Sequence, residues 1–337
     1  MTMNYENDAN RLWIDGCFDF VHHGHACAML QARQTGLRAH KDESRLFVGV
    51  HNDTDINYNK GAPPVMNGPE RYAHAKSIRW CSAVLEDAPY VTDPIWMDRF
   101  RCKYVVHGDD ITLDANGVDC YHVMKKMDRF KVVKRTYGVS TTEIIQRILT
   151  GIVPGPNDED YRPTVNELEF CSLGANGFDK HCYVFDKNLS QECQVVGGGF
   201  EMKLEDTVLV IGDFDLFHVG HIDQLRKIKL ALAPDKKLIA GIKTPSVSSE
   251  SGNTIMTLKE RALSVLSCKY VDGIVMEPDC SITDQPDIFS KVYKMDSREL
   301  IDGGTFSVYL TKEIIIGRIE GQRDVYTKRN IQKGMTM

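Results

Sequence analysis

The chain has 337 residues, 42% of them hydrophobic, and a net charge of −6 at pH 7. This length suits two domains of ordinary size, and the negative charge gives no field that would gather a polyanion, so nucleic acid is excluded as the expected partner. The 10 cysteines show no metal-ligand spacing, and no run approaches the roughly 18 consecutive apolar residues that cross a bilayer. We therefore expect an intracellular protein with free thiols.

The first half alternates short apolar runs with helical patterns. An apolar run enters a turn rich in glycine and histidine, after which Ala26, Met29 and Leu30 are spaced as on one face of a helix. Strands that alternate with helices indicate a parallel sheet with helices on both faces. In chain order we predict strands at 12–14, 46–50, 83–85, 104–106 and 131–133, with helices at 24–32, 70–80 and 119–127.

The second half repeats this order. A strand at 208–211, a helix at 221–232 and a strand at 238–242 follow one another as the first three elements of the chain do. Residues 66–71 are echoed by residues 256–261, and both stretches end in Glu-Arg. Because the echo extends over several elements, the sequence predicts a duplicated domain.

Composition marks the boundary between the two halves. Residues 151–163 contain prolines, Gly-Pro turns and an acidic cluster, which is typical of a linker. The stretch 164–205 contains a candidate strand at 183–185 and cannot be assigned to either half. We predict two tandem Rossmann-like α/β domains with parallel sheets, at residues 10–150 and 206–330, joined by a linker at 151–205.

Both halves contain the same ten-residue string. It reads GCFDFVHHGH at 16–25 and GDFDLFHVGH at 212–221, so the Gly, Phe, Asp and both His of an HxGH motif keep their spacing. Each copy lies where a strand turns into a helix, and the free N–H groups and positive dipole end of that helix face the turn. The string therefore predicts a phosphate-binding turn.

His22 and His25 can both approach one phosphate, while Gly24 lets the backbone come close. Imidazole N–H groups can neutralise charge on phosphate oxygens without acting as bases. We expect Asp19 to orient the motif backbone or a histidine. Two other interpretations stay open: a metal site, although no carboxylate or cysteine has ligand spacing, and histidines that only cap the helix.

The string after the first strand resembles the cytidylyltransferase branch of the HxGH nucleotidyltransferase superfamily. A later string, RTYGVSTT at 135–142, resembles the second signature of that branch, RTEGIS followed by Ser or Thr, with Tyr137 where Glu is usual. Arg135 can fork onto phosphate oxygens, and residues 140–142 can cap the helix that follows. A plain helix cap with Arg135 in solvent is the alternative.

Two further segments resemble elements of the same family. Lys60-Gly61, followed by two prolines, is similar to its lysine loop, in which a mobile ammonium can swing over bound phosphates. The segment His107 to Asp110 ends a predicted strand, where the family binds cytidine and the acceptor substrate. The plain alternatives are a solvated lysine and a solvated acidic turn.

The tandem arrangement resembles the members that use phosphoethanolamine as acceptor, the fungal ones in particular. The choline-specific relatives surround a quaternary ammonium with aromatic rings. In this chain Tyr90 stands where those relatives have Trp, and Leu113 where they have Tyr. Fewer ring faces suit a primary ammonium, which needs hydrogen-bond acceptors such as Asp109 or Asp110.

The second half keeps fewer of these features. It is shorter by about 20 residues where the first half has His107 to Asp110, and no lysine matches Lys60. The sequence DGGT at 302–305 replaces the Arg-Thr-x-Gly string, which leaves Thr311 as the nearest match to the helix cap. We expect a structural or regulatory pseudo-site there, with His218 and His221 as candidate anion ligands.

The resemblance implies transfer of CMP from CTP to phosphoethanolamine for phosphatidylethanolamine synthesis, with Mg²⁺ bound to CTP and no protein metal site. It implies a cytoplasmic enzyme and leaves open a homodimer and peripheral attachment to endoplasmic reticulum membranes. The alternatives are phosphocholine or glycerol phosphate as acceptor, or a non-enzymatic nucleotide sensor. The expected catalytic residues are His22, His25, Lys60 and Arg135; the nucleotide-binding residues are Gly16, Cys17, Phe18, Asp19, Gly24, His107, Gly108, Asp109, Asp110, Gly138, Val139, Ser140, Thr141 and Thr142; and the acceptor-binding residues are Tyr90, Asp109 and Asp110.

Overall fold

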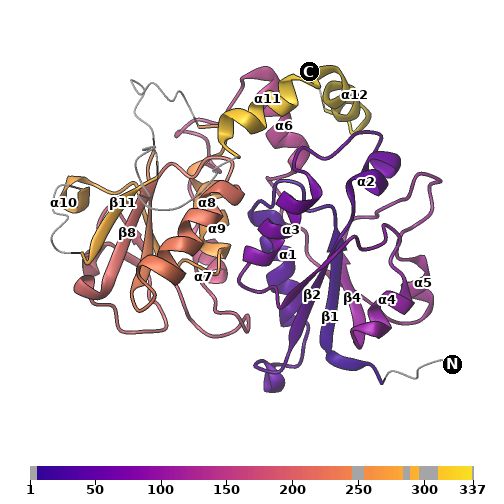
Figure 1. Cartoon of the computed structure of the whole chain (residues 1–337), viewed down its shortest axis with the longest axis horizontal. Coiled ribbons are helices and arrows are strands. Elements are labelled where there is room, and N and C mark those ends of the chain that lie inside the picture. Colours follow the sequence, from indigo (N-terminus) through magenta and orange to yellow (C-terminus); the bar gives the residue numbers. More distant parts are fainter. Residues whose placement is uncertain (1–5, 245–253, 284–288, 296–309, 336–337) are drawn as a thin grey trace. The chain divides into compact units, whose positions relative to one another are not determined.

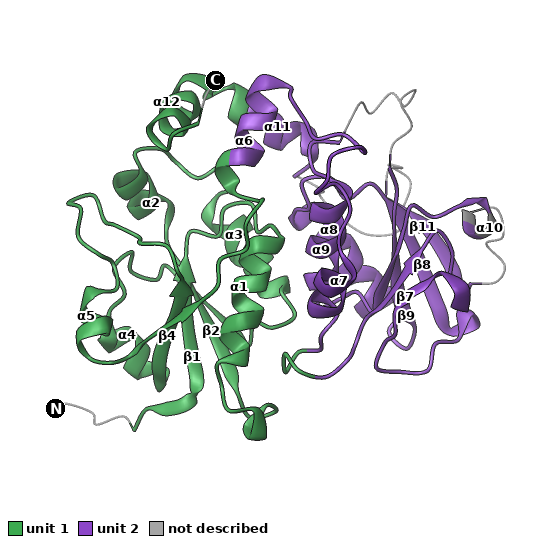
Figure 2. Ribbon diagram, turned by 180° about the vertical axis from the view of Figure 1, so that it is seen from behind, with its two compact units in different colours: residues 1–142, 175–178, 318–337 green, residues 143–174, 179–317 purple. Residues whose placement is uncertain are grey.

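The computed structural model describes residues 6–244, 254–283, 289–295 and 310–335. The chain forms two compact units (Figure 2). Unit 1 comprises residues 1–142, 175–178 and 318–337, and unit 2 comprises residues 143–174 and 179–317. Each unit has its own α/β sheet (Figure 1), which confirms the predicted pair of Rossmann-like folds. Within the described ranges, every helix is too short or too polar to span a bilayer.

Unit 1 is built on a five-stranded sheet in which all neighbours are parallel, in the order β3-β2-β1-β4-β5. Side chains of β1 alternate between its faces. Trp13 packs in the buried cluster that contains Met97 and Met124, whereas Leu12 and Ile14 lie on the opposite face. The strands are β1 (Asp8–Gly16), β2 (Arg45–Val50), β3 (Ala83–Glu86), β4 (Cys102–Gly108) and β5 (Phe130–Val133).

Helices cover both faces of this sheet, with α1 and α3 on one face and α4 and α5 on the other (Figure 1). Helix α5 is shorter than the predicted 119–127, because the Asp119 carboxylate accepts the Tyr121 N–H (2.9 Å) before the helix begins. The helices of unit 1 are α1 (His23–Gln34), η1 (Arg38–His40), α2 (Asp53–Lys60), α3 (Gly68–Ser77), α4 (Pro94–Arg99), α5 (His122–Lys126) and α12 (Arg323–Gln332).

Unit 2 repeats the central order of unit 1. Its sheet runs β11-β8-β9-β10-β6-β7, so that β10-β9-β8-β11 corresponds to β3-β2-β1-β4. All neighbours are parallel except β6 and β7. The strands are β6 (Tyr183–Asp186), β7 (Gln194–Val196), β8 (Thr207–Gly212), β9 (Lys237–Ile242), β10 (Gly273–Met276) and β11 (Lys291–Lys294).

The predicted helix at 221–232 forms as α8 followed by one π-helical turn, η4. Helices α6 and α11 each begin in one unit and end in the other. The remaining helices are α6 (Thr141–Thr150), α7 (Val165–Cys171), η2 (Gln191–Cys193), η3 (Leu204–Asp206), α8 (Val219–Lys227), η4 (Ile228–Leu232), α9 (Leu258–Ser267), α10 (Cys280–Thr283) and α11 (Lys312–Glu320).

The compact units divide the chain differently from the predicted domain boundaries. The expected linker at 151–205 supplies α7, β6 and β7, and β6 pairs with β10 over four residues from Tyr183 to Asp186. Residues 318–337 belong to unit 1, although the sequence places them next to the second half. Both differences have the same cause, since the pairing of β6 and the packing of the C-terminal helix depend on contacts with residues that are distant in sequence.

Two glutamates at equivalent places of the repeat bind arginines from segments that are distant in sequence. Glu70 completes a capping box at the start of α3, and Glu260 does so at the start of α9. In unit 1, both guanidinium ends of Arg318 donate to Glu70 (2.7 and 2.9 Å). In unit 2, Arg147 donates to Glu260 (2.6 Å). Both glutamates are buried, so each arginine fixes its segment to the unit that contains it.

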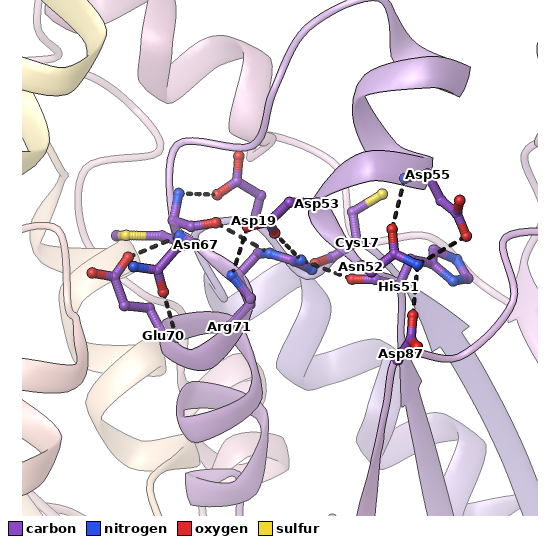
Figure 3. Close-up of polar contacts among 12 residues, drawn as sticks. Cys17, Asp19, His51, Asn52, Asp53, Asp55, Asn67, Glu70, Arg71 and Asp87 are labelled. Atoms are coloured by element: carbon purple, nitrogen blue, oxygen red, sulfur yellow. Dashed lines mark hydrogen bonds and ion pairs between the residues drawn. The ribbon is translucent and has the colours of Figure 1, made fainter.

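A buried arginine connects the segments that surround the carboxyl ends of β1 and β2 (Figure 3). Arg71 donates to the carbonyls of Met66 (3.1 Å), Cys17 (2.6 Å) and His51 (2.7 Å), and to the Asp53 carboxylate (2.6 Å). Its side chain is fully shielded from solvent. One guanidinium therefore holds the turn after β1, the residue after β2 and the start of α2 in a fixed arrangement.

Arg261 of unit 2 makes the same kind of contact. It donates to the carbonyls of Met256 (3.2 Å), Asp213 (2.7 Å) and Lys243 (2.5 Å), which are the counterparts of the three carbonyls around Arg71. The Glu-Arg echo in the sequence therefore marks a structural device that both copies keep.

Replacing Arg71 with Lys should lower the free energy of unfolding of unit 1 by about 3 kcal/mol, because one ammonium cannot serve four acceptors in a buried site. The chain's three tryptophans all lie in unit 1, so tryptophan fluorescence during urea unfolding reports on that unit. The matched control is Arg99→Lys, at an exposed position of α4. Equal urea midpoints for both variants and the wild type would contradict this role.

Candidate active site

The candidate site lies where the strands of unit 1 end. Gly16 of β1 is in register with Val50 of β2, so Cys17 and His51 leave the sheet at the same edge. Trp13 pairs with Val105, which brings the end of β4 to the same level, and Gly108 pairs with Val133 of β5. Motifs from four segments therefore converge at one edge, as expected for ligand sites of parallel α/β sheets.

The turn after β1 has an unusual backbone. Phe18 (φ 47°) and Phe20 (φ 46°) both adopt the left-handed region, and Phe214 (φ 52°) and Leu216 (φ 48°) repeat this in unit 2. Such residues cost of order 1 kcal/mol or more each, so surrounding contacts must hold them. The repeated geometry shows that the string specifies the shape of the turn in both units.

Asp19 ties this turn to two other segments. Its carboxylate accepts the N–H groups of Val65 and Met66 (both 2.9 Å), and its carbonyl accepts the Thr141 hydroxyl (2.8 Å). Burial raises the pKa of Asp19, while the two N–H groups and Arg71 oppose that effect. Asp19 therefore positions the segment after Lys60 and the start of α6, and no geometry suggests a direct chemical role.

His22 and His25 stack on each other, with ring centroids 4.0 Å apart. The Nδ1 atom of each ring is buried and has no hydrogen-bond partner among the described residues. His22 occupies the N-cap position of α1 but makes no side-chain capping bond. The interpretation that these histidines only cap the helix therefore does not fit unit 1.

Both imidazoles are neutral at physiological pH. Burial lowers the pKa of His25 to about 4, and the nearby charges of Lys60 and Arg135 act in the same direction. The pKa of His22 lies well below its ordinary value, mainly because of burial and also because of His25 and Arg135. Each neutral ring carries one N–H donor. The electrostatic influence also shows that Lys60 and Arg135 lie near the histidines.

Gly24 is required by the packing of the two signature strings. A Cβ atom built on Gly24 would lie 2.9 Å from His22 Nδ1 and 3.0 Å from Val139 Cγ1. Val139 is buried, and Gly138 before it has a left-handed backbone (φ 83°). The predicted nucleotide-binding strings thus meet directly, and any larger residue at position 24 would displace a histidine ring.

Lys60 is the last residue of α2, and Gly61 ends that helix in the left-handed conformation (φ 67°). We predicted Lys60 in a loop; the structure places it at a helix end, with the Gly-Pro loop directly after it. Interaction with Cys17 raises the pKa of Lys60, against the effect of burial. Lys60 is therefore a permanent cation beside the motif turn.

Arg135 lies with the acidic residues that follow β4. Its N–H donates to the Asp109 carboxylate (3.2 Å), and its guanidinium donates to Asp110 (3.3 Å). His107 packs its ring on Tyr121, with centroids 4.6 Å apart. Arg135 and both aspartates are exposed, so an incoming ligand can reach them.

Tyr90 lies deeper in the same region. It is buried, and its ring centroid is 4.9 Å from that of His51. Burial raises the pKa of Tyr90 to about 12, while the charge of Lys60 opposes this. The predicted acceptor residue therefore presents a neutral ring near the Lys60 ammonium.

Comparison with known proteins identifies the family. The cytidylyltransferase-like family model matches residues 13–147 and 209–331. The chain belongs to the cytidylyltransferase-like family. It is 57% identical to the ethanolamine-phosphate cytidylyltransferase of Saccharomyces cerevisiae over the full length of both chains. It is 38% identical to that of Dictyostelium discoideum, over 81% of this chain and 74% of the other. Choline-phosphate cytidylyltransferase 2 of Arabidopsis thaliana is 37% identical over 41% of this chain and 44% of its own length.

The second copy of the family motif is arranged differently. His218 Nδ1 accepts the Gly220 N–H (3.1 Å), and His221 Nδ1 accepts the His218 N–H (3.4 Å). The two rings stack as in unit 1, at 4.0 Å, but their Nδ1 atoms serve the helix start. His218 and His221 therefore act as helix caps in unit 2, whereas His22 and His25 do not in unit 1.

Asp215 of the second copy has a lysine partner that is not found for Asp19 among the described residues. It accepts the N–H groups of Ile255 and Met256 (both 2.9 Å), as Asp19 does from the equivalent residues, and the Lys312 ammonium lies 2.7 Å from it. A salt bridge thus occupies the place next to the motif turn. The predicted replacement of the second signature at 302–305 lies outside the described residues.

Some residues of the unit 1 site were not singled out from the sequence. Asp15 is buried at the end of β1 and accepts from Trp13 (2.8 Å), Thr92 (2.7 Å) and Tyr121 (2.8 Å). A polar residue at the end of a predicted strand was an available signal for it. Lys333 of the C-terminal segment lies 3.4 Å from Thr142, and no spacing in the sequence connects these positions.

We predict that His22 and His25 are neutral at pH 6, and that His25 gains a proton only as the pH falls through about 4. Burial disfavours the imidazolium, so protonation begins well below the ordinary pKa of 6.5. A ¹³C-detected histidine titration by NMR measures this, with the His25→Gln variant used to assign the signals. Half-protonation of either ring near pH 6.5 would contradict the burial argument.

Proposed function

We propose that the chain transfers CMP from CTP to phosphoethanolamine, which gives CDP-ethanolamine and pyrophosphate for phosphatidylethanolamine synthesis. One observation carries this proposal: two imidazoles whose Nδ1 atoms are buried and have no partner among the described residues lie near Lys60 and Arg135 at the carboxyl edge of a parallel sheet. The identity with ethanolamine-phosphate cytidylyltransferases over the whole chain supports the choice of substrates.

In the proposed reaction, a phosphate oxygen of phosphoethanolamine attacks the α-phosphorus of CTP. The bond from that phosphorus to the bridging oxygen of the β-phosphate breaks, and pyrophosphate leaves. The neutral rings of His22 and His25 donate N–H groups to phosphate oxygens, and the cations Lys60 and Arg135 offset the charge that develops on the leaving group. No side chain needs to accept a proton, which agrees with the low pKa of both histidines.

Mg²⁺ enters this proposal as part of the substrate. Within the described ranges, no three His, Cys, Asp or Glu side chains are grouped so that they could hold a metal ion. The chain's own contribution is cationic, from Lys60 and Arg135. We propose that Mg²⁺ enters the site bound to the phosphates of CTP.

The choice of phosphoethanolamine as acceptor rests on the side chains expected to contact its ammonium group. Asp109 and Asp110 offer exposed carboxylates, which suit the three N–H donors of a primary ammonium. Tyr90 offers one ring, already packed on His51, and Leu113 is exposed and offers none. A quaternary ammonium would gain little here, since it needs several ring faces.

The cellular setting is part of the same proposal. All ten cysteines lie within the described residues and none of them forms a disulfide, which suits the reducing cytoplasm. A homodimer and peripheral attachment to endoplasmic reticulum membranes stay predictions from the resemblance alone.

The Lys60→Ala variant should lose about 10²- to 10³-fold in CTP-dependent pyrophosphate release, because one permanent charge is removed from the transition state. His22→Ala should show a loss of similar size, whereas the double variant of His218 and His221 to Ala should stay near the wild type. Lys126→Ala, at an exposed position of α5, is the matched control. Wild-type protein that binds CTP without releasing pyrophosphate would instead favour the nucleotide sensor.

Phosphoethanolamine should be used at least about tenfold better than phosphocholine or glycerol phosphate, as measured by kcat/KM for each acceptor. The physical reason is the match between carboxylates and a primary ammonium, where each charge-assisted bond contributes about 1.5 to 3 kcal/mol. Asp110→Asn should raise the KM for phosphoethanolamine more than the KM for CTP. Equal kcat/KM for phosphoethanolamine and phosphocholine would refute the acceptor assignment.

A further inference from the structure

The C-terminal segment of the chain is anchored in unit 1 next to the nucleotide site. Arg318 forms the two-pronged ion pair with buried Glu70 and also donates to the Val65 carbonyl (3.1 Å). Tyr326 of α12 is fully buried, and its hydroxyl donates to the Pro63 carbonyl (3.3 Å). These contacts fix α12 against the segment that follows Lys60, and the Asp19 carboxylate accepts the N–H groups of Val65 and Met66 in the same segment.

The end of α12 reaches the second signature string. The Asn330 side-chain amide donates to the Thr142 carbonyl (3.2 Å), and the Lys333 ammonium donates to the Thr142 hydroxyl (3.4 Å). Asn330 is completely buried, so this junction is a packed contact. Thr142 lies at the start of α6, where free N–H groups already favour an anion.

Arg329 lies between these anchors and has unused donors. Its side chain is 6% exposed, and neither Nε nor Nη2 has a hydrogen-bond partner among the described residues. Its guanidinium lies 5.1 Å from the ring centroid of Tyr326, and Asp19 is close enough to influence its charge. A buried guanidinium with unused N–H groups carries a desolvation cost that a bound anion would remove.

Lys333 lies near three other cations of the site. Removal of its ammonium from water lowers its pKa to about 8, and repulsion from Lys60, Arg329 and Arg135 adds to this effect. Like charges gathered in this way oppose one another until an anion of high charge lies between them. The neutral histidines cannot balance the full charge of a triphosphate, but this group of cations can.

We propose that Arg329 and Lys333 bind the β- and γ-phosphates of CTP, so that the C-terminal helix completes the nucleotide site of unit 1. The inference rests on the proposed function, since it assigns a subsite to the nucleotide of that reaction. The same two side chains would then stabilise the pyrophosphate as it leaves. The α-phosphate stays with His22 and His25.

The test compares CTP with CMP, which lacks the two outer phosphates. We expect Lys333→Gln to weaken CTP and pyrophosphate binding about tenfold or more, measured by calorimetry, and to change CMP binding less than twofold. Lys333→Arg should keep most of the affinity for CTP. The matched control is Lys328→Gln, at an exposed position of the same helix, which should bind all three ligands as the wild type does.

Arg329→Gln should show the same selective loss, but this residue is buried and its variant can lose stability. Lys333 is an exposed residue, so we expect its replacement to leave the fold intact. The Lys333→Gln variant therefore tests the proposal even if Arg329→Gln does not fold. Wild-type affinity for CTP in Lys333→Gln, or an equal loss for CTP and CMP, would overturn the inference and leave α12 a structural role.

Failure of the proposed function gives a different result. A wild type that releases no pyrophosphate from CTP and phosphoethanolamine would refute the reaction. In that case a selective loss of CTP and pyrophosphate binding in Lys333→Gln would still support the subsite on α12.

Discussion

The site depends first on the buried guanidinium of Arg71. It binds the carbonyls of Met66, Cys17 and His51 and the carboxylate of Asp53, so three segments of the chain have one common partner (Figure 3). Without those bonds, the carbonyls would be buried with no donor, and the left-handed turn after β1 would lose a support. Because Arg261 repeats three of the contacts in unit 2, the fold of each copy is set by the same interaction. The two copies differ in the residues that surround this shared interaction.

The two copies differ in how their histidines are satisfied. In unit 1 the Nδ1 atoms of His22 and His25 are buried without partners, whereas in unit 2 the same atoms of His218 and His221 accept backbone N–H groups. A buried polar atom without a hydrogen bond gains stabilisation when a ligand bonds to it, whereas an atom that is already hydrogen-bonded does not. The motif is therefore retained in both copies, but among the described residues its Nδ1 atoms lack partners in the first copy and are hydrogen-bonded in the second. The salt bridge of Lys312 to Asp215 adds to this difference.

The C-terminal segment connects the second half of the chain to the proposed site in the first half. Residues 318–337 follow unit 2 in sequence but pack in unit 1, where Arg318 pairs with Glu70 and α12 contacts Thr142. On our proposal, the cations of α12 serve the triphosphate. Unit 2 has no counterpart of Lys60 or of the second signature string in its sequence. On this proposal it still contributes to the nucleotide site, because the chain continues from unit 2 into α12.

The sequence by itself determined the parallel α/β class and the duplication, and it predicted the strings that bind phosphate, because each depends on local periodicity or on a repeated spacing. It also predicted that His22, His25, Lys60 and Arg135 share one site, since strand ends of a parallel sheet meet at one edge. Only the tertiary structure decided that 183–186 and 194–196 extend the second sheet, that His218 and His221 act as helix caps, and that Asn330 and Lys333 contact Thr142. Those outcomes depend on contacts between residues far apart in the chain, and local spacing contains no information about which distant partner satisfies a given donor.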